Sequence, residues 1–326
     1  MNGNVILKRF ITLLITAAAA MALCFAAAFS FAYASDVTYH DTEDEAAAEL
    51  RSHMVNRDSR VTVGLKGETD QEGLQEMIGR LIDEALDHTG DPVEGDYITF
   101  QYASYKGMGR TGLYDGIPVV EINYEIAYYD DAEMEKETDK KVSEIIESLE
   151  LEGKTQYDKV KAVYEWLRDN VEYEEADADS DIKRTAYGAL INGKAVCQGY
   201  SVSLYRLLLE AGIDNRIVFG KGLSPNGTVG PHTWNIVSLY GRYYYVDVTW
   251  GDTAVIDRYF LLPASSDFEE NHITDEKYAD KSFADIYPMA TVPFDPETSG
   301  IMEMASGMTK KIAGSILSVL SNGNAY

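Results

Sequence analysis

The stretch GKAVCQGYSVSLYRLLLEAG, residues 193–212, decides the fold of this 326-residue chain. Apolar residues recur with helical spacing up to Ala211, and Gly212 is typical of a residue that ends a helix. Cys197 therefore lies in the first turn of a predicted helix. Unpaired N–H groups and the helix dipole favour negative charge at that end, which suits a thiolate. The stretch predicts either a reactive thiol or a buried, inert cysteine.

The N-terminus explains why this thiol has no partner. Two basic residues precede the apolar run 10–31, and an A-x-A cleavage signal closes at Ala34, so residues 1–34 have the pattern of a secretory signal peptide. An uncleaved membrane anchor is the alternative, because about 20 apolar residues span a bilayer. Cleavage would remove Cys24 and leave Cys197 without a disulfide partner. We expect a secreted protein, found outside the cell or at its surface.

The composition limits the partners of the mature protein. The chain holds 28 basic and 54 acidic residues, a net charge of −26, and removal of the two basic residues of the signal peptide makes it −28. Such a surface repels nucleic acid and anionic lipid, so we expect no nucleic-acid partner, and membrane contact only through a retained N-terminal segment. No paired Cys or His spacing indicates a metal, and we expect no cofactor.

The segments that precede and follow the Cys197 helix differ in their periodicity. Helices are predicted over 72–90, 131–150 and 157–173, and strands over 96–107 and 118–129 with Lys106–Gly116 as their connection. After residue 212, short β-rich segments alternate with turn residues. Helices followed by an antiparallel sheet define an α+β fold. The predicted organisation is a signal peptide (1–34), a polar linker (35–70), an N-terminal α+β region (71–150), a catalytic domain (151–275) and a C-terminal extension (276–326).

The C-terminal extension contains an amphipathic stretch. Its apolar residues fall on one helical face and are Ile301, Met304, Met308, Ile312 and Ile316. We expect this face to pack onto the catalytic domain, with contact to a partner or a membrane as the alternatives.

A nucleophilic thiol needs a general base, and the base needs an orienting group. Among the five histidines, His232 opens a predicted strand and can project from the sheet edge towards a helix end. Asp247 interrupts the apolar strand RYYYVDVTWG, and a buried charge is costly unless it is paired. A hairpin turning near Tyr240 would pair position 233 with 247, or 232 with 248. The order Cys, His, Asp therefore predicts a catalytic triad.

Three segments now carry a family resemblance. TAYGALINGKAVCQGYS (185–201), PHTWNIV (231–237) and YYYVDVTWGD (243–252) resemble the core motifs of the transglutaminase-like superfamily. The resemblance covers roughly residues 155–265. It implies a papain-like fold, in which a helix carrying the cysteine packs on an antiparallel sheet carrying the histidine and aspartate, preceded by a smaller α/β region as in secreted bacterial members. It also implies Cys197 as nucleophile, His232 as base and acid, and Asp247 as the residue that orients the base.

The remaining pocket residues are less constrained by the sequence. The hydroxyl of Tyr187 and the side chain of Gln198 are candidates for oxyanion donors, beside the backbone N–H of Cys197. Trp234 and Trp250 flank the motifs and are candidates for pocket walls. Packing is the plainer interpretation for Tyr187 and both tryptophans, and we assign His272 a structural role.

These residues predict acyl transfer through a thioester. The thiolate would attack an amide carbonyl of a protein or peptide, including cell-wall or surface protein. Water would then complete hydrolysis, or an amine would complete crosslinking, and we favour hydrolysis. The alternative is a non-catalytic binding or assembly module at the cell surface.

Overall fold

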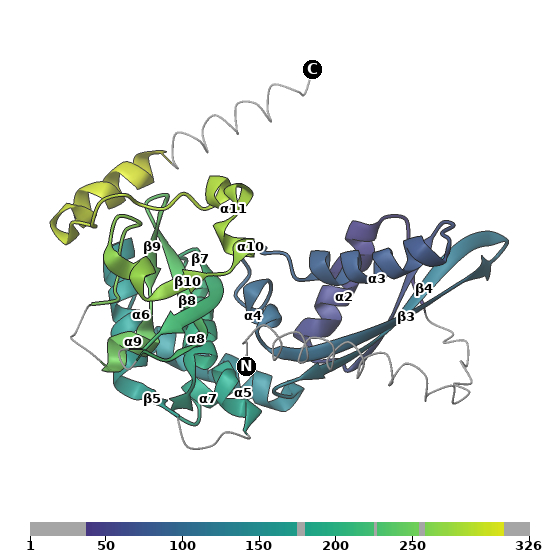
Figure 1. Ribbon diagram of the computed structural model, residues 1–326, viewed down its shortest axis with the longest axis horizontal. Helices are drawn as coiled ribbons and strands as arrows, with labels where there is room; N and C mark the ends of the chain where they lie inside the picture. Colours follow the sequence, from purple (N-terminus) through teal and green to yellow (C-terminus); the bar gives the residue numbers. More distant parts are fainter. Residues whose placement is uncertain (1–36, 175–179, 225–226, 254–257, 310–326) are drawn as a thin grey trace, which may run out of the picture. The chain divides into compact units, whose positions relative to one another are not determined.

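The computed structural model describes residues 37–174, 180–224, 227–253 and 258–309 (Figure 1). The predicted signal peptide lies outside these residues. Within the described ranges, no helix combines the length and the apolar character needed to cross a bilayer. The described residues from Thr38 onward form one compact unit.

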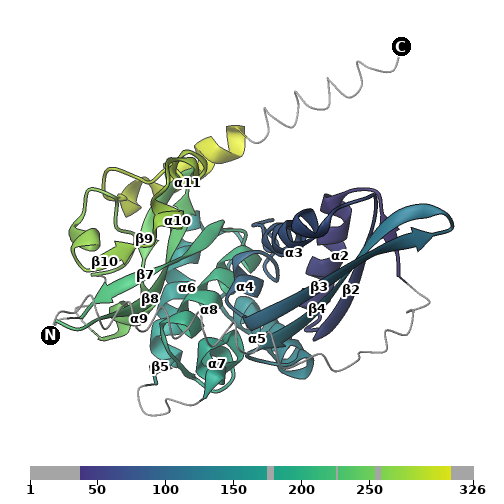
Figure 2. The same cartoon turned by 45° about the vertical axis from the view of Figure 1, so that its right-hand side comes forward.

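The N-terminal region is a four-stranded sheet covered by two helices. Its strands, in the spatial order β1-β2-β4-β3, are β1 (Tyr39–His40), β2 (Arg60–Lys66), β4 (Ile117–Tyr128) and β3 (Tyr102–Tyr114). Its helices are α2 (Glu43–Val55), α3 (Gln71–Ala85) and the short α4 (Asp96–Thr99). β1 pairs with β2 in parallel, and the other pairs are antiparallel. Figure 2 shows β3 and β4 side by side as a long hairpin.

The predicted polar linker 35–70 is wrong, because it contains α2 and β2. Thr42 caps α2 by accepting a hydrogen bond from the Glu45 N–H. The buried face of α2 consists of Ala46, Ala47, Leu50 and Met54. Two of these are alanines and the outer face is acidic, so the apolar period is weak in the sequence although the helix is packed.

The predicted connection Lys106–Gly116 is also wrong, because β3 runs through it to Tyr114. The turn is only Asp115-Gly116, where both residues have positive φ (51° and 79°). Glycine marks close packing instead of a loop at Gly107, where a Cβ would lie 2.3 Å from Cγ2 of Ile78 on α3. The predicted strand 96–107 begins instead as α4, and its pairing with β4 starts only at Tyr102.

The second half of the chain contains the Cys197 helix and an antiparallel sheet. The strands of this sheet, in the order β10-β7-β8-β9, are β10 (His272–Thr274), β7 (Asn215–Leu223), β8 (Val229–Leu239) and β9 (Arg242–Val246). The helices are α5 (Ala132–Ser148), α6 (Gln156–Asn170), η1 (Asp181–Arg184), α7 (Ala186–Leu190), α8 (Cys197–Glu210), α9 (Val248–Thr253), η2 (Asp267–Glu270), α10 (Glu276–Ala279), α11 (Lys281–Ile286) and η3 (Pro296–Thr298). β5 (Glu172–Tyr173) and β6 (Lys194–Ala195) form a separate parallel pair. The α+β fold predicted from the sequence is confirmed.

Both faces of this second sheet are covered. α8 lies against β7 and β8 with ten of its 14 residues buried, including the polar Ser201, Ser203 and Arg206 (Figure 1). α6 and its C-cap add a buried apolar stripe: Val160, Val163, Tyr164, Leu167 and Val171. The opposite face carries an aromatic cluster around Trp234, Tyr245 and Phe268. The two layers fix β8 between them.

The hairpin of β8 and β9 sets up the site. Tyr240 and Gly241 have positive φ (52° and 83°), a two-residue turn that pairs Leu239 with Arg242. The predicted pairing of 233 with 247 is therefore wrong by one position, since the observed register matches Asn235 with Val246. β9 ends there and α9 begins two residues later. Asp247 occupies the junction and not a strand interior.

Buried ion pairs join the N-terminal region to the second half. The Arg57 guanidinium bonds to Asp130 (2.8 Å) and Glu135 (2.6 Å), and Arg206 on α8 reaches Glu135 at 3.5 Å. Asp96 on α4 forms two hydrogen bonds with the side chain of Arg216, a residue of β7. Residues before and after position 131 therefore share one set of buried charges.

The C-terminal extension differs from its prediction. Residues 299–309 are helical, but Ile301 and Met304 are 71% and 68% exposed, and Met308 is exposed as well. The polar side of this helix faces the domain instead: Glu303 Oε2 accepts hydrogen bonds from the Gln156 N–H and the Tyr240 hydroxyl. Ile312 and Ile316 lie outside the described residues.

Candidate active site

Cys197 is the first residue of α8, as the sequence predicts. The residue before it, Val196, is the N-cap and provides no side-chain hydrogen bond to the first turn. The free N–H groups of this turn are available to an anion beside the sulfur. The thiol is partly buried. It therefore has both a polar environment and a route to solvent.

Gly199 allows this turn to pack against the preceding segment. A Cβ there would lie 2.6 Å from the carbonyl oxygen of Lys183 and 2.8 Å from Cβ of Ala195. Only glycine fits without a backbone shift. Cys197 is thus positioned by the close packing of the first turn of α8 against η1 and Ala195.

The thiol of Cys197 is hydrogen-bonded to residues of β8. His232 and Thr233 both form hydrogen bonds with Cys197, and the Ser201 hydroxyl donates to Thr233 Oγ1 (3.2 Å). Burial by itself raises the pKa of the thiol. The hydrogen bond and the positive charge of His232 outweigh this, and the pKa lies below its usual value. The site therefore stabilises the thiolate relative to that of a free cysteine.

His232 and Asp247 form a short, buried pair. His232 Nε2 donates to Asp247 Oδ2 at 2.7 Å, which leaves Nδ1 for the thiol. Burial lowers the pKa of His232, but the carboxylate of Asp247 and the bonds to Asp247 and Cys197 raise it to about 10. Burial likewise raises the pKa of Asp247, but His232 and His272 bring it well below its ordinary value. The three predicted triad residues thus form one chain of hydrogen bonds.

Asp247 has further partners that the sequence did not reveal. Its Oδ1 accepts the Trp250 N–H at 3.2 Å, so it caps the start of α9. Its Oδ2 also accepts from His272 Nε2 at 3.0 Å. His272, predicted to be structural, lies on the first residue of β10 and belongs to the immediate surroundings of the site. Only the fold brings it there, since 25 residues separate it from Asp247.

The two tryptophans have different positions. Trp250 stacks on the His232 ring, with centroids 4.6 Å apart and planes inclined by 19°, and it also contacts His272. This is consistent with the predicted pocket wall. Trp234 is fully buried in the aromatic cluster. Its ring lies near His232 but belongs to the core, so the packing interpretation holds for Trp234.

The structure does not bring the two oxyanion candidates to the thiol. The Tyr187 hydroxyl donates to Glu137 on α5 at 3.2 Å, in an exposed position. The Gln198 Nε2 donates to the carbonyl oxygen of Phe100 at 2.6 Å. Both side chains are therefore engaged elsewhere. The backbone N–H groups at the start of α8 remain the donors that this geometry offers.

A metal deserves consideration because His232, Asp247 and His272 present ligand atoms within 4.8 Å of one another. Asp247 Oδ2, the oxygen that an ion would need, already accepts an N–H bond from each histidine. The hydrogen bonds account for this grouping without a cation. We assign no metal to it.

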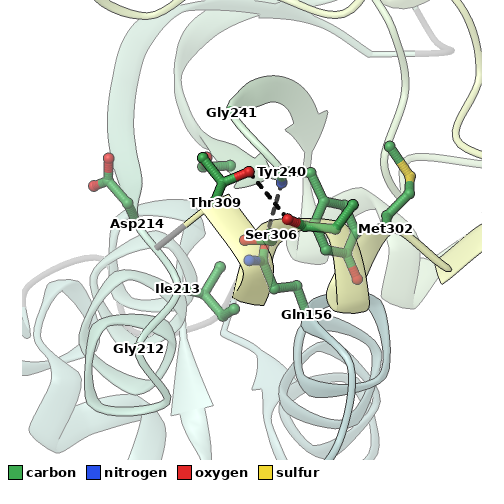
Figure 3. Close-up of a pocket in the computed structure, with 11 residues that line it drawn as sticks. Gln156, Gly212, Ile213, Asp214, Tyr240, Gly241, Met302, Ser306 and Thr309 are labelled. Carbon is green, nitrogen blue, oxygen red and sulfur yellow. Dashed lines mark hydrogen bonds between the residues drawn. The ribbon is translucent and has the colours of Figure 1, made fainter. Parts of the chain in front are cut away.

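The cavity in Figure 3 is separate from this site. It has a volume of about 520 Å³ and lies between the C-terminal helix and the start of α6, with Gln156, Tyr240, Met302 and Thr309 among its lining residues. Gln156 also accepts the backbone N–H of Tyr240 across it. None of the predicted site residues lines this cavity.

Fold and site together define an α+β protein in which a helix-terminal cysteine faces a histidine and a carboxylate at the end of a sheet. Residues 144–248 match the model of the transglutaminase-like superfamily. This part of the chain is therefore similar to that superfamily, whose members are generally cysteine enzymes.

Known proteins are similar to parts of the chain. Kyphoscoliosis peptidase from Homo sapiens is 28% identical over 163 residues, which cover 42% of this chain and 23% of that protein, and the Mus musculus protein matches equally well. The match thus spans about a quarter of the length of these curated relatives. A crystal structure of a TGase aligns with a TM-score of 0.32 and 16% identity over 65% of this chain and 59% of that one. A TM-score this low supports no conclusion about function.

Proposed function

We propose that this protein is a cysteine enzyme that cleaves amide bonds through a thioester on Cys197. One observation carries the proposal. A cysteine at a helix N-terminus is hydrogen-bonded to His232, and His232 is hydrogen-bonded to the buried carboxylate of Asp247 at 2.7 Å. This is the arrangement of nucleophile, base and orienting group that acyl transfer requires. The superfamily match supports it.

Each residue has one role in the proposed reaction. The Cys197 thiolate attacks the amide carbonyl carbon, and the carbonyl π electrons move to oxygen. The N–H groups at the start of α8 stabilise that oxyanion. The C–N bond then breaks, and the leaving nitrogen takes the proton of His232 Nδ1. Asp247 keeps the imidazole oriented throughout.

The second half of the reaction decides the product. Neutral His232 would remove a proton from water, which then hydrolyses the thioester, or from an amine, which then forms a new amide. We propose hydrolysis, with a protein or peptide as substrate. The peptidase name of the kyphoscoliosis relative supports this choice. Export through the N-terminal segment remains part of the proposal, and the first residue of the secreted protein, read by mass spectrometry, tests it.

Thiol reactivity tests the proposal without knowledge of the substrate. We expect iodoacetamide at neutral pH to alkylate Cys197 at least ten times faster than a model thiol, because the thiolate is favoured. His232→Ala should remove most of that advantage. Mass spectrometry of the peptide that contains Cys197 measures the rate separately from Cys24.

His88→Ala is the matched control. His88 is a histidine of the same structure, but it bonds to Tyr205 and Asp214 and not to the thiol. Its removal should leave the alkylation rate unchanged. A Cys197 that reacts no faster than the model thiol would contradict the enzymatic proposal and favour a binding or assembly module. A library of peptides, with the acyl group trapped on Cys197, then identifies the substrate.

A further inference from the structure

The imidazole of His272 lies between two hydrogen-bond acceptors. Its Nδ1 is 3.1 Å from the carbonyl oxygen of Phe268, and its Nε2 is 3.0 Å from Asp247 Oδ2. The residue is 1% exposed, so bulk water does not replace either partner. Phe268 also stacks on the ring, with centroids 3.7 Å apart. The ring is therefore held in one orientation.

This geometry determines how many protons the ring needs. A carbonyl oxygen and an ionised carboxylate can only accept, and a neutral imidazole carries a single N–H. A neutral ring would leave one nitrogen lone pair facing an oxygen lone pair. Rotating the ring by a half turn does not help, because carbon atoms would then face both acceptors. Only the imidazolium form satisfies Phe268 and Asp247 together.

We propose that His272 is a positively charged positioning residue that holds Asp247 and balances its charge, so that His232 can release its proton during the reaction. This inference rests on the proposed function. It assigns His272 no contact with the substrate. His272 affects the reaction only through its contact with Asp247.

The proposed role of His272 follows from the charges of the four ionisable groups during the reaction. In the resting site, the thiolate and Asp247 are negative, and His232 and His272 are positive. When the thioester forms, the sulfur becomes neutral and His232 gives its proton to the leaving nitrogen. Asp247 and His272 then remain as a neutral pair beside a neutral His232. Without the charge of His272, the lone carboxylate would hold the proton on His232 more tightly and oppose its transfer to the leaving nitrogen.

Other titratable groups also surround His272. His232 is the nearest charged ring, with centroids 5.4 Å apart, and the Tyr259 ring lies at 5.7 Å. On the far side, a cavity of about 480 Å³ is lined by His272 together with Glu269, Tyr245, Tyr278 and Tyr287. The Glu269 carboxylate accepts the Tyr245 hydroxyl at 3.0 Å.

The charge of His272 can be measured directly. In ¹⁵N-histidine-labelled wild-type protein at pH 7, with a chelator present, we expect both ring nitrogens of His272 to carry protons. A ring with one unprotonated nitrogen overturns the proposal. This measurement needs neither catalysis nor a variant, so it remains decisive if the proposed enzymatic function fails.

The effect on His232 needs a second measurement. Iodoacetamide converts the thiolate into a neutral thioether, which imitates the thioester state. In this alkylated protein, His272→Gln keeps a donor towards Asp247 but removes the charge. We expect the NMR titration midpoint of His232 to rise by about one to two pH units, the size expected for loss of a unit charge about 5 Å away. An unchanged midpoint overturns the proposal.

Phe268→Leu is the matched control for packing. It removes the ring stacked on His272 but leaves both of its acceptors, since one is a backbone carbonyl. The His232 midpoint should stay where it is in the wild type, even if stability falls. A shift as large as that of His272→Gln would show that packing and not charge is responsible, and would also overturn the proposal.

Discussion

Asp247 is the residue at which the interactions of the site meet. Its two oxygens accept N–H bonds from Trp250, His232 and His272, and it is 1% exposed. A carboxylate with three donors stays ionised, in agreement with its lowered pKa. Asp247 is therefore suited to orient a base and unsuited to act as one.

The pairing of His232 predicts a pH-dependent stability. Its folded-state pKa of about 10 is higher than the value of about 6.5 for a free histidine. The stability that protonated His232 adds is fully present below about pH 6.5 and is lost as the pH rises through about 10. In a Cys197→Ala background, His232→Gln should cost on the order of 2 kcal/mol more near pH 6 than near pH 10.

Urea unfolding at several pH values measures this difference. The thiol is removed so that its own titration does not contribute, while Asp247 remains to raise the pKa of His232. A cost that is constant across the range, or larger near pH 10, would contradict the assigned pairing.

At the residue scale, the motifs themselves point to the three residues that the structure brings together. Cys197, His232 and Asp247 were each marked by a helix start, a strand start or an isolated charge. Tyr187 and Gln198 could not be judged in that way. Their partners, Glu137 and Phe100, are distant along the chain, and side-chain direction follows from tertiary contacts that no local pattern encodes.

At the scale of elements, the contact between α3 and β3 depends on the absence of side chains. Gly107 lies under Ile78, and Gly109 lies under Leu74 on the same helix. Two glycines in alternate positions of a strand allow the helix to approach closely. They also give β3 the composition of a loop, which is why the sequence predicted a connection there.

This contact predicts different costs for two similar substitutions in β3. Gly107→Ala places a methyl group 2.3 Å from Ile78 Cγ2 and 3.3 Å from Tyr124, so we expect a loss of about 1–3 kcal/mol in the free energy of unfolding. Gly112→Ala, in the same strand, meets nothing within 4 Å and is the control. Chemical denaturation compares the two. Equal effects would mean that α3 does not pack as described.

The hairpin of β8 and β9 shows a second limit of prediction at this scale. Its existence could be predicted from alternating residues around Tyr240, but its register depends on the turn type. A one-position change decides whether Asp247 lies in the ladder or at its end. The true register places it at the start of α9, where its carboxylate also serves as a cap.

At the scale of the whole molecule, buried charges make the N-terminal region part of the folded unit. Glu135 accepts from the Tyr97 hydroxyl at 3.0 Å and pairs with Arg57 and Arg206. The sequence suggested separate segments before and after residue 150. Composition could not show that charged residues of both segments pair in the interior, since pairing partners of buried charges are set by the fold.

We expect one cooperative unfolding transition for the whole described chain. All three tryptophans, Trp166, Trp234 and Trp250, belong to the second half, whereas far-UV circular dichroism reports on both halves. The two signals should change at the same urea concentration. Two separate midpoints would contradict a shared interior.

Glu135→Gln should lower the free energy of unfolding by about 3 kcal/mol, and with it the common midpoint, because two guanidinium groups lose a buried counter-charge. Asp285→Asn is the control. Asp285 pairs with Lys281 on the surface, where an ion pair contributes about 1 kcal/mol or less. Similar losses for the two variants would argue against the buried network.

The stacking of Trp250 on His232 has an optical consequence. Protonated imidazole is an electron acceptor and quenches an indole that it touches, whereas neutral imidazole quenches far less. With ring centroids 4.6 Å apart, the emission of Trp250 follows the proton of its neighbour. The resting pair is the dark state, and the emission should brighten when acylation leaves His232 neutral. The difference between wild-type and Trp250→Phe emission would then follow turnover in real time, without a label.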